Sequence, residues 1–264
     1  MIKSNKNLRI IGLIQARMGS KRLKNKALLK INGKTIIQII FERLKAVKGI
    51  DDIILSTSAS KENDVLTSHA KDIGLKYYRG SEDDLILRHL GAVNALGADA
   101  FLKVTADCPL VDVKIADEML KIYKKNYGKI DFMTNCLPPT FPDGLDLDIT
   151  PTLTLENLGR EIKNPLHREY YAAYIMENPA KFKVHNFKSN SDFSSLRWTL
   201  DYQEDLGFIK EIFDNFKNQK TFFMEDILKF MDKNPKVIEV NKSKVDKTII
   251  NNIRSKSYHE ENKK

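Results

Sequence analysis

The chain has 264 residues, of which 42% are hydrophobic and 30% are charged, with a formal net charge of +9. These proportions exclude a peptide-sized scaffold, a collagen-like or low-complexity chain, and a chain that is disordered as a whole. No apolar run approaches the roughly 18 to 20 residues of a membrane-spanning helix. The two cysteines, Cys108 and Cys136, form no CxxC pair. We therefore expect a cytoplasmic protein without a membrane span, a signal peptide or a disulfide framework.

The positive charge is concentrated at the two ends of the chain. Residues 1–34 contain ten Lys or Arg and no Asp or Glu, whereas residues 241–264 contain seven basic and three acidic side chains. The remaining 206 residues carry 27 basic and 32 acidic side chains. A short cationic segment suits a compact polyanion such as a nucleoside triphosphate better than a long duplex. Nucleic acid is therefore not the expected partner, although the basic tail leaves weak binding open.

The first half of the chain alternates buried strands with amphipathic helices. The hydrophobic pattern predicts strands at 8–15, 52–57, 76–78, 100–105 and 131–134, and helices at 35–48, 61–74, 83–96 and 112–127. Such alternation predicts an α/β fold, a doubly wound and mostly parallel sheet whose ligands lie beyond the carboxyl ends of the strands. We interpret residues 1–136 as a nucleotide-binding core.

The pattern is looser between residues 137 and 190, where three prolines interrupt the chain. Residues 143–150 alternate like a strand, and helices are predicted at 151–163 and 165–178. We interpret residues 137–190 as a smaller insertion. A strand at 196–200 and helices at 204–216 and 224–232 then return to the core in residues 191–240, and residues 241–264 are predicted to be a flexible basic tail.

The strongest local signal is the segment LIQARMGSKRLKNKALL at 13–29, directly after the first strand. It matches neither the P-loop nor the dinucleotide-binding pattern. Gly19 and Ser20 permit a tight turn whose N–H groups can face an anion, and Arg17, Arg22 and Lys26 supply positive charge around it. A solvated basic loop is the alternative, and composition alone leaves the two interpretations about equally open.

This segment resembles the opening signature of the CMP-sugar synthetase type of cytidylyltransferase, especially the branch of spore-coat polysaccharide biosynthesis. Acylneuraminate and 3-deoxy-manno-octulosonate cytidylyltransferases are related to it. The resemblance implies a Rossmann-like nucleotidyltransferase fold similar to that of GT-A enzymes. It covers roughly residues 8–216 and continues through LSTS (55–58), YRGSEDD (78–84), VTADCPL (104–110), TNCLPPTFPDGLDLDI (134–149), REYYAAYI (168–175) and SSLRWTLDYQEDL (194–206).

Two aspartates follow predicted strands, Asp107 after 100–105 and Asp201 after 196–200. Each taken alone also suits a turn or a helix N-cap. The resemblance implies that both bind Mg²⁺, and a hard dication does prefer carboxylate and phosphate oxygens. The catalytic residues that it implies are Arg17, Arg22, Lys26, Asp107 and Asp201.

The resemblance also implies two sets of substrate-binding residues. The nucleotide-binding set contains the three cations of the signature segment, Arg17, Arg22 and Lys26. Its other members are Gln15, Ala16, Gly19, Ser20, Thr57, Ser58, Arg79, Gly80 and Ser81. The acceptor-binding set is Asp143, Gly144, Asp146, His167, Arg168 and Glu169. Serines after a strand and an acidic turn are also ordinary structural features. The sequence departs from the family pattern at Tyr170, where histidine is common, at Lys24-Asn25, where Pro-Gly is usual, and at Ala106, where glycine is usual.

The resemblance as a whole implies a Mg²⁺-dependent enzyme of surface-polysaccharide biosynthesis. It would transfer CMP from CTP to an acidic sugar, nonulosonate- or Kdo-like, or to a phosphorylated small metabolite, with release of pyrophosphate. A homodimer formed through residues 137–190 is also expected. The alternatives are a nucleotidyltransferase for another base, a nucleotide-sugar glycosyltransferase, and an inactive or nucleic-acid-binding protein that retains the fold.

Overall fold

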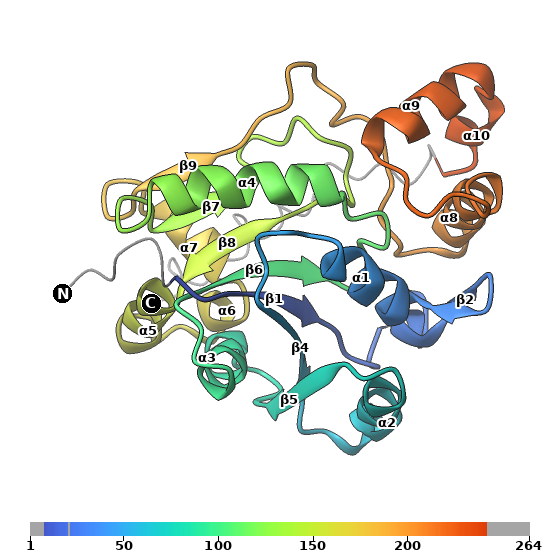
Figure 1. The fold of residues 1–264 in the computed structure, drawn as a ribbon. Helices are drawn as coiled ribbons and strands as arrows, with labels where there is room; N and C mark the ends of the chain where they lie inside the picture. Colours follow the sequence, from blue (N-terminus) through green and yellow to red (C-terminus); the bar gives the residue numbers. More distant parts are fainter. Residues whose placement is uncertain (1–7, 21, 242–264) are drawn as a thin grey trace, which may run out of the picture.

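The structure is a computed structural model that describes residues 8–20 and 22–241 (Figure 1). Within them one seven-stranded sheet has the order β5-β4-β1-β6-β8-β7-β9. Its strands are β1 (Ile10–Gln15), β4 (Asp52–Ser58), β5 (Lys76–Gly80), β6 (Ala100–Thr105), β7 (Phe132–Thr134), β8 (Asp148–Pro151) and β9 (Val184–Asn186). All pairs are parallel except those of β8, which is antiparallel to both β6 and β7. The predicted mostly parallel α/β sheet is therefore confirmed.

Helices cover both faces of this sheet (Figure 1). One face carries α3 (Leu85–Ala95), α5 (Thr152–Glu161), α6 (Pro165–Glu169) and α7 (Tyr171–Glu177), and the other carries α1 (Ile36–Lys45), α2 (Asp64–Asp72), α4 (Val113–Lys125), α8 (Gln203–Asn215) and α9 (Met224–Lys233). In the central strand β1, Ile11 and Leu13 pack toward the first face, while Ile10 and Ile14 pack toward the second. Burial on both sides explains why this strand is a continuous apolar run.

Three predicted elements differ from the structure. Residues 196–200 do not form a strand: this prediction was wrong, because the backbone there bonds to two loops, with Trp198 N–H donating to Asp143 and Leu200 N–H to Asp107. The strand predicted at 143–150 begins only at Asp148, after a turn at Gly144. The helix predicted at 165–178 is divided between α6 and α7 at Tyr170, whose backbone is not helical.

Several short elements were not predicted. These are the hairpin of β2 (Lys30–Ile31) and β3 (Lys34–Thr35), strand β9, helix α10 (Lys236–Glu239), and the 3₁₀ turns η2 (Lys26–Leu28) and η3 (Lys61–Asn63). Two- to four-residue elements carry too little hydrophobic periodicity to be recognised in a sequence.

The segment expected to be an insertion extends the core. Strands β8 and β9 both come from residues 137–190, yet they complete the same sheet as the core strands. The roles of this segment in acceptor binding and dimerisation stay predictions. The basic tail predicted at 241–264 lies, apart from Asn241, outside the described residues. Among the helices that are described, none has the length and apolar character needed to cross a membrane.

Candidate active site

A cavity of about 700 Å³ lies at the carboxyl ends of β1 and β6. This volume is typical of a small-ligand site. Its walls are the signature segment, the residues that follow β6, the first turns of α3, the α6–α7 segment and Asp201. Ten residues predicted for the site line it, namely Gln15, Ala16, Arg17, Gly19, Ser20, Arg22, Lys26, Asp107, Glu169 and Asp201.

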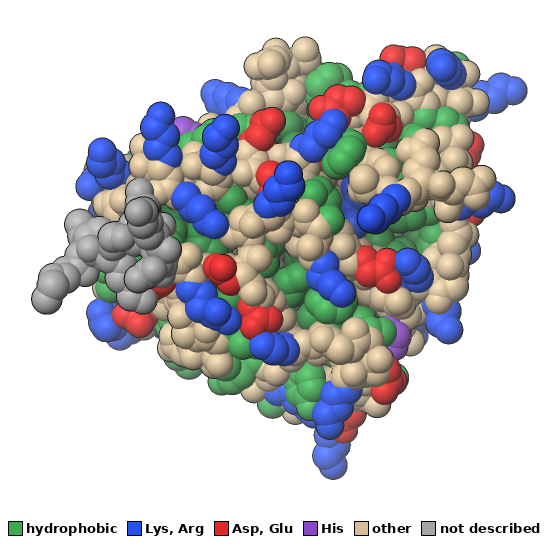
Figure 2. Space-filling view, viewed as in Figure 1, with side chains coloured by type: hydrophobic (Ala, Val, Ile, Leu, Met, Phe, Trp, Pro, Cys, Tyr) green, Lys and Arg blue, Asp and Glu red, His purple; other side chains and the backbone are tan. Residues whose placement is uncertain are grey.

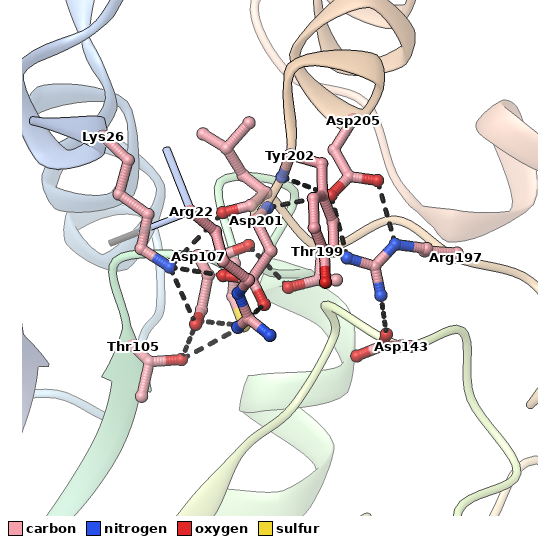
Figure 3. Close-up of polar contacts among 12 residues, drawn as sticks. Arg22, Lys26, Thr105, Asp107, Asp143, Arg197, Thr199, Asp201, Tyr202 and Asp205 are labelled. Atoms are coloured by element: carbon pink, nitrogen blue, oxygen red, sulfur yellow. Dashed lines mark hydrogen bonds and ion pairs between the residues drawn. The ribbon is translucent and has the colours of Figure 1, made fainter. Parts of the chain in front are cut away.

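The two predicted metal-binding aspartates converge on one ammonium group (Figure 3). Nζ of Lys26 lies 3.2 Å from Oδ2 of Asp107 and 2.7 Å from Oδ1 of Asp201. The second carboxylate oxygen of Asp201 accepts a hydrogen bond of 2.5 Å from Nη2 of Arg22. Side chains from three distant parts of the sequence thus meet in one network of charges.

Backbone contacts fix the position of Asp107 at the end of β6. Its carbonyl accepts hydrogen bonds from Leu200 N–H at 2.8 Å and from Thr199 Oγ1 at 3.2 Å. Its carboxylate also accepts one from the Thr105 hydroxyl. The extended segment that replaces the predicted strand at 196–200 therefore holds Asp107 beside Asp201.

A buried ion pair holds Asp201 from the other side (Figure 3). Asp201 N–H donates to Oδ2 of Asp205 at 2.9 Å. Asp205 is 0% exposed and accepts two hydrogen bonds from Arg197, at 2.9 and 2.8 Å. Such two-point pairing has a defined geometry, and it orients the start of α8 and the aspartate that precedes it.

The charges in the network stabilise one another. Burial lowers the pKa of Lys26, but Asp107 and Asp201 outweigh it, and the net shift is upward. Burial raises the pKa of Asp107, but Lys26 and the Thr105 hydroxyl outweigh it, and the net shift is downward. Lys26 and Asp107 are therefore both charged at neutral pH.

The donor set of this network fits Mg²⁺. The ion is usually bound by one or two carboxylates, with phosphate and water oxygens completing its shell. Asp107 and Asp201 supply two carboxylates beside the same point in space. No third His, Cys, Asp or Glu joins them in a metal-binding group within the described part of the chain. The remaining positions would therefore fall to a ligand and to water.

The signature segment, residues 13–29, is held by a local contact at Met18 and departs from the family pattern at Asn25. Met18 N–H donates to Oδ1 of Asn63, which fixes the loop to the turn after β4. Asn25 adopts φ 56°, the left-handed conformation that glycine favours and that asparagine tolerates better than most residues. Asn25 can therefore replace the usual glycine, and η2 follows it directly and carries Lys26 into the cavity.

Five of the residues predicted to bind the nucleotide do not line the cavity. Thr57 and Ser58 are fully buried, and Ser58 bonds to Glu82 and Asn63. Arg79, Gly80 and Ser81, which are also predicted to bind the nucleotide, are likewise not among the residues that line the cavity. Arg79 instead donates to two backbone carbonyls and pairs with a surface carboxylate at 2.6 Å. The Ser81 carbonyl accepts a hydrogen bond from Nη1 of Arg88, and the Ser81 hydroxyl accepts one from the N–H of Asp84, the N-cap residue of α3.

Gly80 has a packing role that requires a small residue. A Cβ atom at Gly80 would lie 2.9 Å from Cα of Arg88, and one at Gly91 would lie 2.1 Å from the Tyr78 ring. The two glycines therefore let α3 lie directly against β5. This close approach helps to place Arg88 in the cavity wall.

Of the predicted acceptor residues, only Glu169 lines the cavity. His167 bonds to Glu177 at 2.9 Å, and Arg168 bonds to Asp84 at 2.5 Å. Through these contacts both side chains connect α6 to neighbouring segments. The sequence could not distinguish this role from ligand binding, since either role places charged residues at the start of a helix.

The acidic segment at 143–148 lies behind Asp107. Asp143 pairs with Arg197 at 3.1 Å, and Gly144 adopts φ 106°, with its backbone pressed against Thr199. The surrounding protein and the neighbouring carboxylates raise the pKa of Asp143 to about 6 and that of Asp146 to about 7. Neither aspartate nor Gly144 lines the cavity, so any contact with an acceptor stays a prediction.

Sequence reasoning missed two cations in the cavity wall, Arg88 and Lys103. Lys103 interrupts the apolar strand β6 and pairs with Asp148 of β8 at 2.6 Å. A charged residue within a buried strand is a signal that could have been noticed. Arg88 carried no such signal, because an arginine in an amphipathic helix is usually solvated.

Comparisons with known proteins agree with this geometry. The family model of cytidylyltransferases matches residues 11–230. A cytidylyltransferase structure from Leptospira borgpetersenii is 36% identical and superposes with a TM-score of 0.84, covering 88% of this chain and 97% of that one.

Two relatives have more specific names. The spore coat polysaccharide biosynthesis protein SpsF of Bacillus subtilis is 24% identical, with 86% of this chain and 95% of the relative covered. An 8-amino-3,8-dideoxy-manno-octulosonate cytidylyltransferase of Shewanella sp. (strain W3-18-1) is 24% identical, with 66% of this chain and 67% of the relative covered. The match over most of the sequence and the likeness of the folds lead to one conclusion: the chain belongs to the cytidylyltransferase family.

Proposed function

We propose that this cytidylyltransferase transfers CMP from CTP to an acidic sugar, with Mg²⁺ as cofactor and pyrophosphate as the second product, in the biosynthesis of a surface polysaccharide. The observation that carries the proposal is the convergence of Arg22 and Lys26 with Asp107 and Asp201 at the mouth of one cavity. The names of the relatives support an acidic sugar and a polysaccharide pathway.

The proposed reaction exchanges the α–β phosphoanhydride bond of CTP for a phosphodiester bond to the acceptor. A hydroxyl oxygen of the acceptor gives up its proton to solvent and attacks the α-phosphorus of CTP, and the bond from that phosphorus to the α,β-bridging oxygen breaks. Negative charge then grows on the departing pyrophosphate. Arg17, Arg22 and Lys26 lie in the cavity wall, where their positive charges offset the growing negative charge. Mg²⁺, when bound by Asp107 and Asp201, would neutralise phosphate charge and act as a Lewis acid.

Lys26 has a second role before substrate binds. Two neighbouring carboxylates repel each other, and their repulsion would raise the pKa of one of them. The ammonium of Lys26 contacts both carboxylates, and its charge outweighs burial and holds the pKa of Asp107 below its ordinary value. The two carboxylates are therefore held close together before a phosphate or a cation arrives.

The structure gives no support to the glycosyltransferase alternative. The D-x-D candidate is Asp146-Leu147-Asp148, but Asp148 is committed to Lys103 at 2.6 Å, and neither aspartate lines the cavity. On the face shown in Figure 2, Lys and Arg side chains are interspersed with Asp and Glu. That face shows no continuous basic stripe of the kind that binds nucleic acid.

The proposal is tested by pyrophosphate release from CTP, UTP, ATP and GTP. Each nucleotide is combined with Mg²⁺ and a panel of acidic sugars and phosphorylated metabolites. We expect release that requires both CTP and an acidic sugar, and loss of this release in Asp107→Ala. Equal release with another nucleotide, activity with phosphorylated metabolites alone, or full activity in Asp107→Ala would contradict the proposal.

A further inference from the structure

Arg88 is a buried cation in the cavity wall that forms no ion pair with any carboxylate of the described residues. The residue is 5% exposed, and it lies in the second turn of α3. The other cavity-lining cations, Arg17, Arg22, Lys26 and Lys103, each lie within 4.0 Å of a carboxylate. Within residues 8–20 and 22–241, no ion pair of Arg88 meets that limit.

The surroundings of Arg88 do not compensate for its charge. Burial is the largest influence on its pKa and lowers it, and the positive charge of Arg17 lowers it further. The nearby carboxylates of Glu82, Glu169 and Asp84 only partly oppose this shift. A buried guanidinium without a paired anion is unfavourable, so the site is suited to an anion that enters the cavity.

The hydrogen bonds of Arg88 leave one edge of its guanidinium unused. Nη1 donates to the carbonyl oxygens of Ser81 at 2.7 Å and Glu82 at 3.0 Å. Nε is buried and has no hydrogen-bond partner among the described residues, and none of their hydrogen bonds uses Nη2. The Nε–Nη2 edge presents two parallel donors, which match the two oxygens of a planar carboxylate.

The location of Arg88 favours the acceptor over the triphosphate as the source of this anion. The cations next to Asp107 and Asp201 come from the signature segment, whereas Arg88 comes from α3 and neighbours the α6–α7 segment. Leu85, Ala172 and Ala173 line the cavity near these helices. Apolar side chains of this kind can exclude water from a carboxylate bound there, and exclusion of water strengthens its pairing with a guanidinium.

We propose that Arg88 binds the carboxylate of the acidic sugar acceptor through its Nε–Nη2 edge. This assignment rests on the proposed function, because it identifies the group by which the acceptor of that reaction is held. Arg88 is here a binding and specificity residue that would favour an acid over a neutral sugar.

The test measures binding without turnover. The full chain is titrated by calorimetry, in the absence of CTP, with 3-deoxy-manno-octulosonate and with its carboxamide, which lacks the negative charge. Variants are Arg88→Met, Arg88→Lys and Arg43→Met. Arg43 is a matched control, because it is also buried and bonded to backbone carbonyls but does not line the cavity. Circular dichroism establishes that each variant is folded.

We expect the unaltered protein to bind the acid about 10- to 100-fold more tightly than the carboxamide, the range given by a charge-assisted, two-point hydrogen bond. Arg88→Met should abolish this preference, Arg88→Lys should retain part of it, and Arg43→Met should retain all of it. The assignment is overturned if the unaltered protein binds neither compound or shows no preference, or if Arg88→Met keeps the preference. It is also overturned if Arg88→Met weakens CTP binding instead.

Turnover separates a failure of this inference from a failure of the proposed function. If acidic sugars support pyrophosphate release and Arg88→Met leaves the acceptor KM unchanged, the function stands and the assignment of Arg88 is wrong. If no acidic sugar supports release but the acid is bound in an Arg88-dependent manner, the carboxylate site stands and the proposed function is wrong.

Discussion

Replacing Lys26 by methionine removes the ammonium that contacts both aspartates while keeping a side chain of similar length. In the structure Nζ donates to Asp107, to Asp201 and to the Leu200 carbonyl, at 3.2, 2.7 and 3.3 Å. Lys26 is proposed to offset charge on the departing pyrophosphate, and loss of one preorganised donor of this kind costs about 2.7 to 4 kcal/mol. We therefore expect kcat/KM for pyrophosphate release to fall about 100- to 1000-fold.

Two controls separate this effect from a general loss of charge. Lys34→Met removes an ion pair to Glu42 in which both side chains are about half exposed, 50% and 42%. Such a surface pair contributes roughly 0 to 1 kcal/mol to stability, and Lys34→Met should leave activity within twofold of the unaltered protein. Lys26→Arg keeps the charge and should recover part of the loss. Activity of Lys26→Met within threefold of the unaltered protein would refute the reasoning.

Two further predictions concern stability. Gly144→Ala should lower the free energy of unfolding by about 3 kcal/mol or more, because Gly144 has φ 106° and a Cβ atom there would lie 2.4 Å from the backbone N of Thr199. Gly33 has φ 82° but lies in open space, so Gly33→Ala should lower the free energy of unfolding by only about 1 to 2 kcal/mol. Urea denaturation measures both, and equal losses would contradict the prediction. Asp146→Asn should raise the melting temperature at pH 8 but not at pH 4. The pKa of Asp146 is raised to about 7 in the folded protein, so its ionisation destabilises the fold as the pH rises from about 4 through 7. A melting-temperature difference that does not change with pH would count against this assignment.

The layered core could be predicted from the sequence, because its strands and helices have strong hydrophobic periodicity. The apolar segment at 196–200 has the same pattern but is not a strand. Its backbone bonds instead to Asp107 and to the turn at Asp143, which lie 50 residues or more away in the chain. Contacts of this kind depend on the finished fold, so local pattern cannot reveal them.

The candidate site, too, could be predicted only in part from the sequence. Resemblance to a family identified Arg22, Lys26, Asp107 and Asp201, and the structure brings these four side chains together. The same reasoning placed Arg168 at the acceptor, but its guanidinium is bonded to Asp84 and to backbone carbonyls. The sequence does not show which charged residues already have partners in the fold. That information decides which of them are left for a ligand.

Asp107 and Asp201 are proposed to bind one magnesium-bearing nucleotide through the same pair of carboxylates. The most direct test of this proposal is calorimetric titration of CTP, with and without Mg²⁺, into the unaltered protein and into Asp107→Asn, Asp201→Asn and Asp52→Asn. Asp52 pairs with Arg9 and Lys76 at the opposite end of the sheet and serves as the control. We expect Mg²⁺ to strengthen CTP binding in the unaltered protein and in Asp52→Asn, and either active-site substitution to remove this gain. The same gain from Mg²⁺ in all four proteins would contradict the proposal.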